Sequence, residues 1–363
     1  MKLLFDVTPL MRRSLTGVGV YTANLLQGLL QRQQEDFRLL PTWKASRFRQ
    51  RRLLRHHLSV RTSPYLPFIS DLNIQGYDLF HGPDFKLPRH GRLKKVVTVH
   101  DLGVYQEGLL DERFAAEGRV KFETMLFGCR PDRIITVSKF TRNQLIERFP
   151  QFEAITHAIP LGVNSRLFPA DANTPSPAPS FTPDARPYLL FVGAVERRKN
   201  LRNIIKATEL LIERGNNLEL KIVGGDGYDA QAINQQIRES RHGQRMVRIG
   251  FVSNGELSQL YQGAVGFLYP SLYEGFGLPI LEAMSAGCPV ITSNCGAMLE
   301  VSGRAALHAD PNSPESIAAQ AEVLLQQSEV RENLVTAGKA HAAGFGWERC
   351  VAETVRVYQE LVG

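Results

Sequence analysis

Short apolar runs alternate with amphipathic stretches along the first half of the chain. Lys2–Phe5 has the pattern of a buried strand, and Val18–Leu30 carries apolar residues at helical spacing. Three further apolar runs predict buried strands at Leu79–Phe80, Val96–His100 and Ile134–Val137. Ser138 follows the last of them and is placed to cap a helix that runs through Arg148. Strands that alternate with helices predict a parallel α/β sheet.

The composition changes sharply at residues 168–187, where the chain reads FPADANTPSPAPSFTPDARP. A segment so rich in Pro, Ala and Ser cannot supply a packed core, and it predicts a linker over residues 169–187. A second α/β series follows at once, with elements predicted at Tyr188–Val192, Leu201–Arg214, Leu218–Val223, Arg248–Phe251, Val265–Tyr269 and Pro289–Thr292.

The length of 363 residues also favours two domains, because one hydrophobic core rarely grows so large. We therefore predict an N-terminal α/β domain over residues 1–168 and a C-terminal one over residues 188–345. The amphipathic stretch Trp347–Leu361 predicts a terminal helix within residues 346–363. Ligands of such domains favour the carboxyl ends of the strands.

The composition is that of a soluble globular protein, with 43% hydrophobic and 22% charged residues. No apolar run reaches the length of a membrane span, and the N-terminus makes a poor signal peptide and a good strand. Cys129, Cys288, Cys295 and Cys350 are scattered, which favours reduced thiols over a disulfide framework or a zinc site. These features predict a cytoplasmic protein.

The net charge of +7 is concentrated in Lys44–Arg61, which holds seven Lys or Arg residues and no acid. Such a segment suits anionic lipid headgroups at the inner face of the cell membrane, or an acceptor that bears phosphate. A solvated helix face is the simpler interpretation and stays open. Nucleic acid is not favoured as a partner, because no recognised nucleic-acid-binding motif accompanies the basic segment.

A glycine-containing loop in YPSLYEGFGLPILEAM, Tyr269–Met284, has the pattern of a diphosphate site. Its glycines let the backbone approach a ligand, and Pro279 stands where the first residue of a helix belongs. The amides at a helix start attract anions. Glu282, in the predicted first turn, is placed to accept hydrogen bonds from two ribose hydroxyls. Glu274, eight residues earlier, is placed to bind hydroxyls of a second polar group.

A basic turn follows the predicted strand Tyr188–Val192 in FVGAVERRKNL. It brings Glu196, Arg197, Arg198 and Lys199 to the carboxyl end of that strand. Adjacent cations at this position would neutralise a pyrophosphate and stabilise its charge as it leaves. A solvated basic loop is the simpler alternative. The position at a strand end, in the same domain as the glutamate loop, favours the functional interpretation.

With these motifs the chain resembles family 4 of the retaining glycosyltransferases, whose GT-B fold has two Rossmann-like domains that face each other across a cleft. The E-x7-E element of the family matches Glu274 and Glu282, and its basic phosphate-binding pair matches Arg198 and Lys199. IPLGVNSRLF resembles the end of the family's N-terminal domain. WERCVAETVRVYQEL resembles its terminal helix, which crosses back to that domain. The resemblance implies a nucleotide-sugar donor on the C-terminal domain and an acceptor on the N-terminal one.

The N-terminal domain carries further resemblances. Gly17 and Gly19, in LTGVGVYTANLL, resemble the family's glycine loop that approaches the donor phosphates, although a plain helix start is the alternative. LFHGPDFKLP and VVTVHDL resemble segments of a mannosyltransferase subgroup, and His100 matches a histidine near the transferred sugar. Asp101 is interpreted as a turn cap and not as a base.

The resemblance thus implies catalytic roles for Arg198, Lys199, Glu274 and His100. It implies donor contacts by Gly17, Gly19, Gly193, Phe276, Gly277, Leu278 and Glu282. It also implies a front-face substitution without a protein nucleophile, in contrast to retaining hydrolysis by two carboxylates. Since the sequence has no Asp-x-Asp triplet, we expect neither a metal nor another cofactor.

The predicted reaction is the transfer of a hexose, with mannose favoured, from a GDP- or UDP-sugar to a hydroxyl of a glycan or lipid-linked acceptor in bacterial surface polysaccharide synthesis. The alternatives are a sugar-nucleotide epimerase or a phosphorylase of the same architecture, and a sugar-nucleotide-binding scaffold without activity. A Rossmann dehydrogenase fits worse, because no G-x-G-x-x-G directly follows the first strand.

Overall fold

The computed structural model describes residues 1–12, 15–32, 37–54, 62–65, 76–89, 93–163 and 186–363. The chain divides into two compact units. Residues 1–162 and 346–363 form the first unit, and residues 163–345 form the second. The C-terminal segment therefore packs with the N-terminal part of the chain. The predicted linker lies outside the described residues over 169–185.

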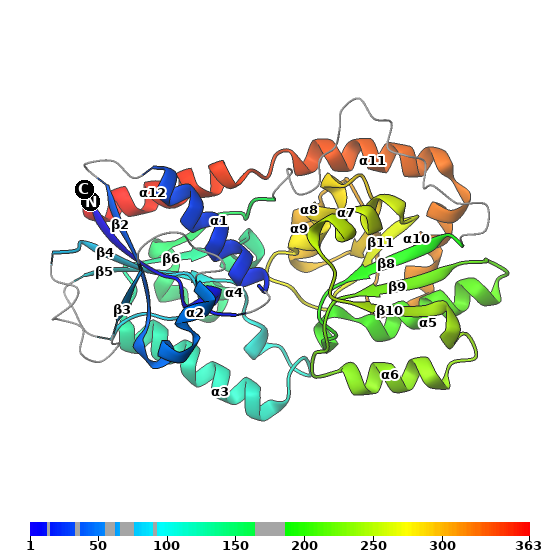
Figure 1. The fold of residues 1–363 in the computed structure, drawn as a ribbon, viewed down its shortest axis with the longest axis horizontal. Coiled ribbons are helices and arrows are strands. Elements are labelled where there is room, and N and C mark those ends of the chain that lie inside the picture. Colours follow the sequence, from blue (N-terminus) through cyan, green and yellow to red (C-terminus); the bar gives the residue numbers. More distant parts are fainter. Residues whose placement is uncertain (13–14, 33–36, 55–61, 66–75, 90–92, 164–185) are drawn as a thin grey trace. The chain divides into compact units, whose positions relative to one another are not determined.

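The first unit holds a sheet of seven parallel strands in the order β3-β2-β1-β4-β5-β6-β7 (Figure 1). The strands are β1 Lys2–Asp6, β2 Arg38–Lys44, β3 Ser63–Tyr65, β4 Leu79–Gly82, β5 Lys94–Val99, β6 Arg133–Thr136 and β7 Thr156–Ala158. The order reverses between β1 and β4, as in doubly wound nucleotide-binding sheets.

The second unit repeats this plan with six parallel strands in the order β10-β9-β8-β11-β12-β13. The strands are β8 Tyr188–Val192, β9 Glu219–Val223, β10 Met246–Gly250, β11 Gly266–Tyr269, β12 Val290–Ser293 and β13 Leu307–Ala309. Here the order reverses between β8 and β11, so the loops that follow these two strands begin side by side at the carboxyl edge.

Helices connect the strands within each unit (Figure 1). They are α1 Gly17–Gln31, α2 Arg51–Leu54, α3 Glu112–Glu123, α4 Lys139–Arg148, α5 Leu201–Glu213, α6 Ala230–Glu239, α7 Asn254–Gly263, α8 Leu278–Ser285, α9 Gly296–Ser302, α10 Pro314–Gln326, α11 Ser328–Ala342 and α12 Trp347–Val362. No helix in these described ranges is long and apolar enough to cross a membrane.

Helical spacing of apolar residues explains how these helices pack. In α5, residues Leu201, Ile204, Ile205 and Leu211 fall on one face and are buried in the core of the second unit. In the first unit α12 lies beside α1 (Figure 1). A Cβ on Gly28 would lie 2.4 Å from the Val351 side chain, so the close approach of these two helices requires glycine there.

Several strands were not predicted from the sequence. β2 escaped prediction because it contains Pro41, a residue that rarely lies inside a paired strand. β3 and β7 have three residues each, and so does β13, which leaves too few positions for a periodic pattern. By contrast, the predicted cap is confirmed, since the Ser138 hydroxyl accepts a hydrogen bond from the Thr141 amide.

The basic segment from Lys44 onward also differs from the predicted helix face. Lys44 ends β2, and the chain then forms a 3₁₀ turn over Ala45–Gln50 before the four residues of α2. No acid–base pairs at helical spacing support a longer helix in this part of the sequence. Residues 55–61 of the segment lie outside the described residues.

A buried polar network fastens α12 to the first sheet. The two ring nitrogens of His81 on β4 are hydrogen-bonded to the Tyr358 hydroxyl on α12 at 2.5 Å and to Thr98 Oγ1 at 2.8 Å. Thr98 Oγ1 is also hydrogen-bonded to the Tyr21 hydroxyl on α1 at 2.9 Å. Burial lowers the pKa of His81 to about 3, so the ring is neutral, with one hydroxyl donating to it and the other accepting from it.

Tyr358→Phe is expected to destabilise the first unit by about 1–3 kcal/mol, because it leaves a nitrogen of the buried His81 ring without its partner. The measurement is the urea midpoint of the full-length variant. Tyr228→Phe, at a tyrosine of the second unit that is 58% exposed, serves as the control. A midpoint for Tyr358→Phe that matches this control would contradict the role of the network.

Candidate active site

Two loops meet where the second sheet reverses its strand order. One follows β8 and contains Arg198 and Lys199. The other follows β11 and contains Glu274. The Leu272 amide donates to the Arg198 carbonyl at 2.8 Å, and Asn200 Nδ2 donates to the Pro270 carbonyl at 2.8 Å. The two loops therefore form one connected structure at the carboxyl edge of the sheet.

Glu274 is the centre of a buried ion cluster between these loops. Arg198 Nη1 donates to Glu274 Oε2 at 2.5 Å, and Lys199 Nζ lies 2.5 Å from Glu274 Oε1. Arg198 Nε also donates to Glu196 Oε2 at 2.7 Å. The side chains of Lys199 and Glu274 are 10% and 9% exposed, so these two charges are held largely away from water. The pattern of the sequence placed these residues on separate loops, and the structure brings them into contact.

Tyr269 completes the cluster and escaped the sequence analysis. Its hydroxyl accepts a hydrogen bond from Lys199 Nζ and donates to Glu274 Oε1 at 3.2 Å. The lysine nitrogen also lies 4.7 Å from the centre of the tyrosine ring. A tyrosine at the last position of a buried strand, just before the glutamate loop, was the available signal.

The two loop charges shift each other's titration. Burial raises the pKa of Glu274, but the nearby Lys199 and Arg198 cations outweigh this effect and hold it below the usual value. Burial lowers the pKa of Lys199, and the Glu274 carboxylate opposes that shift. Glu274 is therefore ionised near neutral pH. It accepts hydrogen bonds from two cations, which hold it in its charged form.

Helix α8 begins directly after this cluster. Gly277 is its N-cap with φ of 104°, a left-handed conformation that favours glycine. Phe276 and Leu278 are buried, so their side chains offer little surface to a donor. The helix begins at Leu278, so Pro279 is its second residue and not the first as predicted.

Glu282 is the fifth residue of α8 and lies in its second turn, one turn later than predicted, because the helix starts at Leu278. Burial of the carboxyl group raises its pKa to about 7, although Lys199 and the Tyr261 hydroxyl act in the opposite direction. This group therefore changes charge in the physiological range. Lys199 and Tyr269 both connect it electrostatically to the Glu274 cluster.

Gly193 follows β8 and packs against the neighbouring loop. Its amide donates to the Val223 carbonyl at 2.9 Å. Its carbonyl oxygen lies 2.2 Å from where a Cβ on Gly224 would stand, so Gly224 must be glycine for the two loops to pass. A Cβ on Gly193 itself would lie 3.7 Å from Lys199 Cδ, an ordinary contact. Gly193 thus lies beside the lysine stem.

His100 belongs to the first unit and directly follows β5. Its Nε2 lies 2.7 Å from the Pro83 carbonyl and donates to it, and its ring meets the Tyr21 ring edge-on at 5.1 Å. Burial lowers the pKa of His100, so its ring is neutral and Nδ1 keeps an acceptor lone pair. The Asp101 carboxylate accepts from the Gly103 amide at 2.9 Å, which confirms its prediction as a turn cap.

Gly17 and Gly19 lie in the first turn of α1, which begins one residue before the predicted Val18. The helix extends through them because Thr16 takes the extended conformation of an N-cap. A Cβ on Gly17 would meet nothing within 4 Å, whereas one on Gly19 would lie 3.0 Å from the Leu15 side chain. Gly17 therefore leaves open space at the start of α1, and Gly19 makes room for Leu15.

Comparison with known proteins gives the family. Residues 15–167 match the model described as Glycosyltransferase Family 4, and residues 174–341 match the one described as Glycosyl transferases group 1. The O-antigen chain mannosyltransferase B of Escherichia coli is 31% identical over 99% of this chain and 100% of its own length. The chain belongs to glycosyltransferase family 4. As a member of this family it is a glycosyltransferase, as the Glu274–Glu282 motif predicted.

Solved structures agree with this fold. Sucrose-phosphate synthase from Thermosynechococcus elongatus superposes with a TM-score of 0.76 at 20% identity, covering 99% of this chain and 98% of that one. Alr3699/HepE of Anabaena, solved in complex with UDP, gives 0.76 at 17% identity with 99% coverage of both chains. The prediction of two Rossmann-like domains of the GT-B class is confirmed.

Proposed function

We propose that this glycosyltransferase moves a hexose from a nucleotide diphosphate sugar to a hydroxyl acceptor with retention of anomeric configuration. The observation that carries the proposal is the buried cluster of Arg198, Lys199 and Glu274 beside the N-terminus of α8. Two cations and a helix start at one sheet edge form a site for a diphosphate. Retention is typical of the family.

In the proposed reaction the bond between the anomeric carbon and the diphosphate oxygen breaks as Arg198 and Lys199 stabilise the departing charge. The acceptor oxygen attacks the same face and gives its proton to the leaving phosphate oxygen. Glu274 keeps both cations in place through its two carboxylate oxygens. Glu282 binds the ribose hydroxyls, Gly193 and the backbone of residues 276–278 approach the donor, and Gly17 and Gly19 approach its phosphates. His100 contacts the transferred sugar.

The proposed donor is GDP-mannose, with UDP-hexoses as the next candidates. The relative from Escherichia coli is named a mannosyltransferase of the O-antigen chain, and the Anabaena structure holds UDP. The proposed acceptor is a hydroxyl of a glycan or lipid-linked glycan of a bacterial surface polysaccharide. We propose that no metal takes part, because Arg198 and Lys199 supply positive charge at the diphosphate.

Thermal shift against GDP, UDP, ADP, TDP and their common sugar conjugates tests the donor site. We expect one diphosphate to raise the melting temperature selectively, with the same rise in magnesium and in EDTA. Anomeric configuration is then read by NMR of the product formed with that donor. A flat response to every nucleotide would contradict the donor site. Release of free nucleotide without transfer to any acceptor would favour the epimerase alternative.

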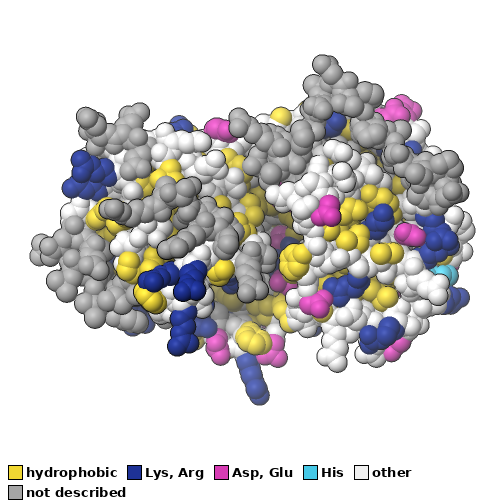
Figure 2. Space-filling model, in the orientation of Figure 1, with side chains coloured by type: hydrophobic (Ala, Val, Ile, Leu, Met, Phe, Trp, Pro, Cys, Tyr) yellow, Lys and Arg dark blue, Asp and Glu magenta, His cyan; other side chains and the backbone are white. Residues whose placement is uncertain are grey.

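We further propose peripheral contact with anionic membranes through the basic segment. Arg47, Arg49, Arg51 and Arg52 are exposed, and the Phe48 side chain is 55% exposed with the Arg51 guanidinium 3.8 Å from its ring centre. Figure 2 shows Lys and Arg side chains gathered beside hydrophobic ones in this region of the first unit. Arginines around an exposed aromatic ring suit a headgroup layer.

Replacing these four arginines with glutamine is expected to weaken binding to anionic vesicles by at least tenfold, since each basic residue near such a surface contributes about 1 kcal/mol. Sedimentation with vesicles that contain phosphatidylserine measures it, with neutral vesicles for comparison. The matched control removes four exposed charges of the second unit, Arg202, Lys206, Arg238 and Arg241. Equal losses in both variants would contradict a specific membrane surface.

A further inference from the structure

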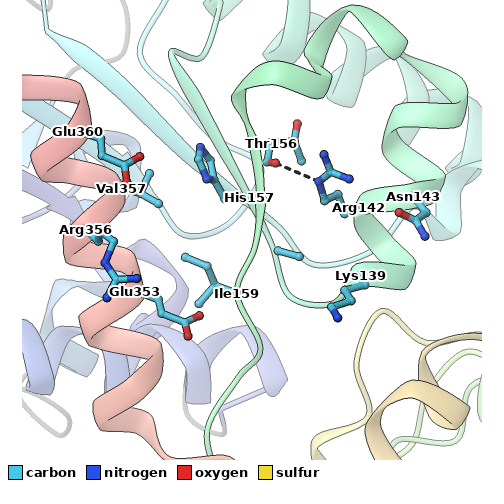
Figure 3. A pocket seen from close by; sticks show the side chains of 11 residues that line it. Lys139, Arg142, Asn143, Thr156, His157, Ile159, Glu353, Arg356, Val357 and Glu360 are labelled. Carbon is cyan, nitrogen blue, oxygen red and sulfur yellow. Dashed lines mark hydrogen bonds between the residues drawn. The ribbon is translucent and has the colours of Figure 1, made fainter.

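A cavity of about 550 Å³ lies at the open edge of the first sheet. Its floor is β7, the last strand in the sheet order, and its walls are α4 and α12 (Figure 3). Every lining residue belongs to the first unit, so the cavity is complete without the second. None of them belongs to the Glu274 cluster or to the His100 surroundings. The volume suits a small ligand.

Four polar side chains of this cavity make no hydrogen bond or ion pair with the described part of the chain, namely Asn143 on α4, His157 on β7, and Arg356 and Glu360 on α12. Asn143, Arg356 and Glu360 are exposed to water, and the Glu360 carboxylate interacts electrostatically with His157. His157 Nε2 is shielded from water, and a shielded polar atom without a hydrogen bond is unusual. In Figure 3 the His157 ring extends from β7 toward α12. The cavity thus offers donors and acceptors together.

The charges of the cavity are of both signs, which suits a neutral polar ligand better than a simple anion. Its cations are Lys139, Arg142 and Arg356, and its acids are Glu360 and Glu353, of which Glu353 already accepts from Arg349 Nε at 2.8 Å. A phosphate would be attracted by the cations and repelled by the acids. A polyhydroxylated ligand meets no such repulsion, because each hydroxyl donates to a carboxylate and accepts from a cation or an amide.

A peptide or lipid fits the cavity less well. The outward carbonyl of Thr156 on β7 already accepts from Arg142 Nε at 3.1 Å, which obstructs the pairing of a further strand. The apolar residues Ile159 and Val357 are each 4% exposed, so they offer little surface to an acyl chain or a hydrophobic anchor. The lining therefore favours sugar hydroxyls.

We propose that this cavity is a secondary glycan-binding site that holds part of the acceptor chain away from the reacting end. The choice of a glycan as ligand rests in part on the proposed function, whereas the polar lining stands by itself. Arg356 and Glu360, one helical turn apart on α12, would form hydrogen bonds with the sugar hydroxyls from one wall of the cavity. Asn143 on α4 would do so from the opposite wall.

The test uses the full-length protein, a linear α-mannotetraose and inorganic phosphate as probes, and isothermal titration calorimetry. The variant Arg356→Ala/Glu360→Ala removes one charge of each sign from exposed positions of α12. Arg238→Ala/Glu239→Ala makes the same change on α6 of the second unit and is the matched control. We expect mannotetraose to bind the wild type and the control alike and the α12 variant at least tenfold more weakly.

With a single-sugar acceptor, turnover by both variants is expected to stay within twofold of the wild-type value. With a tetrasaccharide acceptor, KM is expected to rise only in the α12 variant. The proposal is overturned if mannotetraose does not bind the wild type, or binds the α12 variant equally well. It is also overturned if phosphate, and not the glycan, loses affinity in that variant. Because binding is measured without turnover, a failure of the proposed reaction remains distinguishable from a failure of this site.

Discussion

Lys199→Met is expected to lower turnover with the true nucleotide-sugar donor by about 10²–10³-fold, the loss typical when one charge-stabilising group is removed from an active site. Lys199 is buried, lies 2.5 Å from Glu274 Oε1, and belongs to the loop that follows β8. A methionine keeps the unbranched stem but not the charge, so the departing diphosphate would lose one of its two cations.

The same substitution should also lower stability, by about 3 kcal/mol or somewhat less, because it breaks a buried ion pair while Arg198 remains on Glu274. Turnover is therefore measured well below the melting temperature and normalised to folded protein. Lys206→Met, at an exposed lysine of α5, is the matched control. Lys199→Met/Glu274→Gln should recover part of the stability and none of the turnover. Normal turnover by folded Lys199→Met would refute the assignment.

Glu282→Ala is expected to weaken binding of the nucleotide by about 1.5–3 kcal/mol, or roughly 10- to 150-fold, through the loss of charge-assisted hydrogen bonds to ribose. The raised pKa of about 7 adds a pH dependence. The ionised carboxylate is the better acceptor, so wild-type affinity should rise up to about tenfold per pH unit below 7 and level off above it. Glu282→Gln should remove this dependence.

Calorimetry between pH 5.5 and 8.5 with a nucleotide sugar tests this, because the diphosphate of such a donor keeps a constant charge over that range. Folding provides a second readout. The folded protein binds the Glu282 proton more tightly than the unfolded chain, so this group reduces stability as pH rises from 4.5 to 7. Glu282→Gln should therefore gain thermal stability relative to wild type at pH 8 but not at pH 4.5. Melting temperatures of the wild type and Glu282→Gln that change with pH in parallel would contradict the raised pKa of Glu282.

Local patterns predicted the elements that have long or strongly apolar sequences. The strand at Tyr188–Val192 follows from a continuous apolar run, and the helix from Leu201 follows from apolar residues at helical spacing. Local patterns did not predict the strand at Arg38–Lys44, because Pro41 interrupts it. They did not predict the strand at Thr156–Ala158 either, because it has only three residues. Both are strands because a neighbouring strand pairs with them, and no local pattern records that neighbour.

The residues of the candidate site also fall into those that local sequence patterns predicted and those that only the structure identified. The sequence identified Glu274, Glu282, Arg198 and Lys199, since each lies in the loop after a predicted strand or in the helix that follows that loop. It did not identify Tyr269, whose role depends on the loop after β8 approaching the end of β11. Nor did it indicate the cavity beside His157, whose wall residues Asn143 on α4 and Glu353 on α12 lie 210 positions apart in the sequence.

The sequence alone therefore determined the class of fold, the two α/β series and the charged residues that carry the proposed chemistry, because hydrophobic period, turn residues and charge are properties of short segments. Only the tertiary structure decided that Glu274 pairs with both Arg198 and Lys199, that the Glu282 carboxyl titrates near pH 7, and that α12 closes the cavity of the first unit. The physical reason is that burial and charge pairing depend on which distant segments meet, and strand order, set by the packing of the whole sheet, decides those meetings.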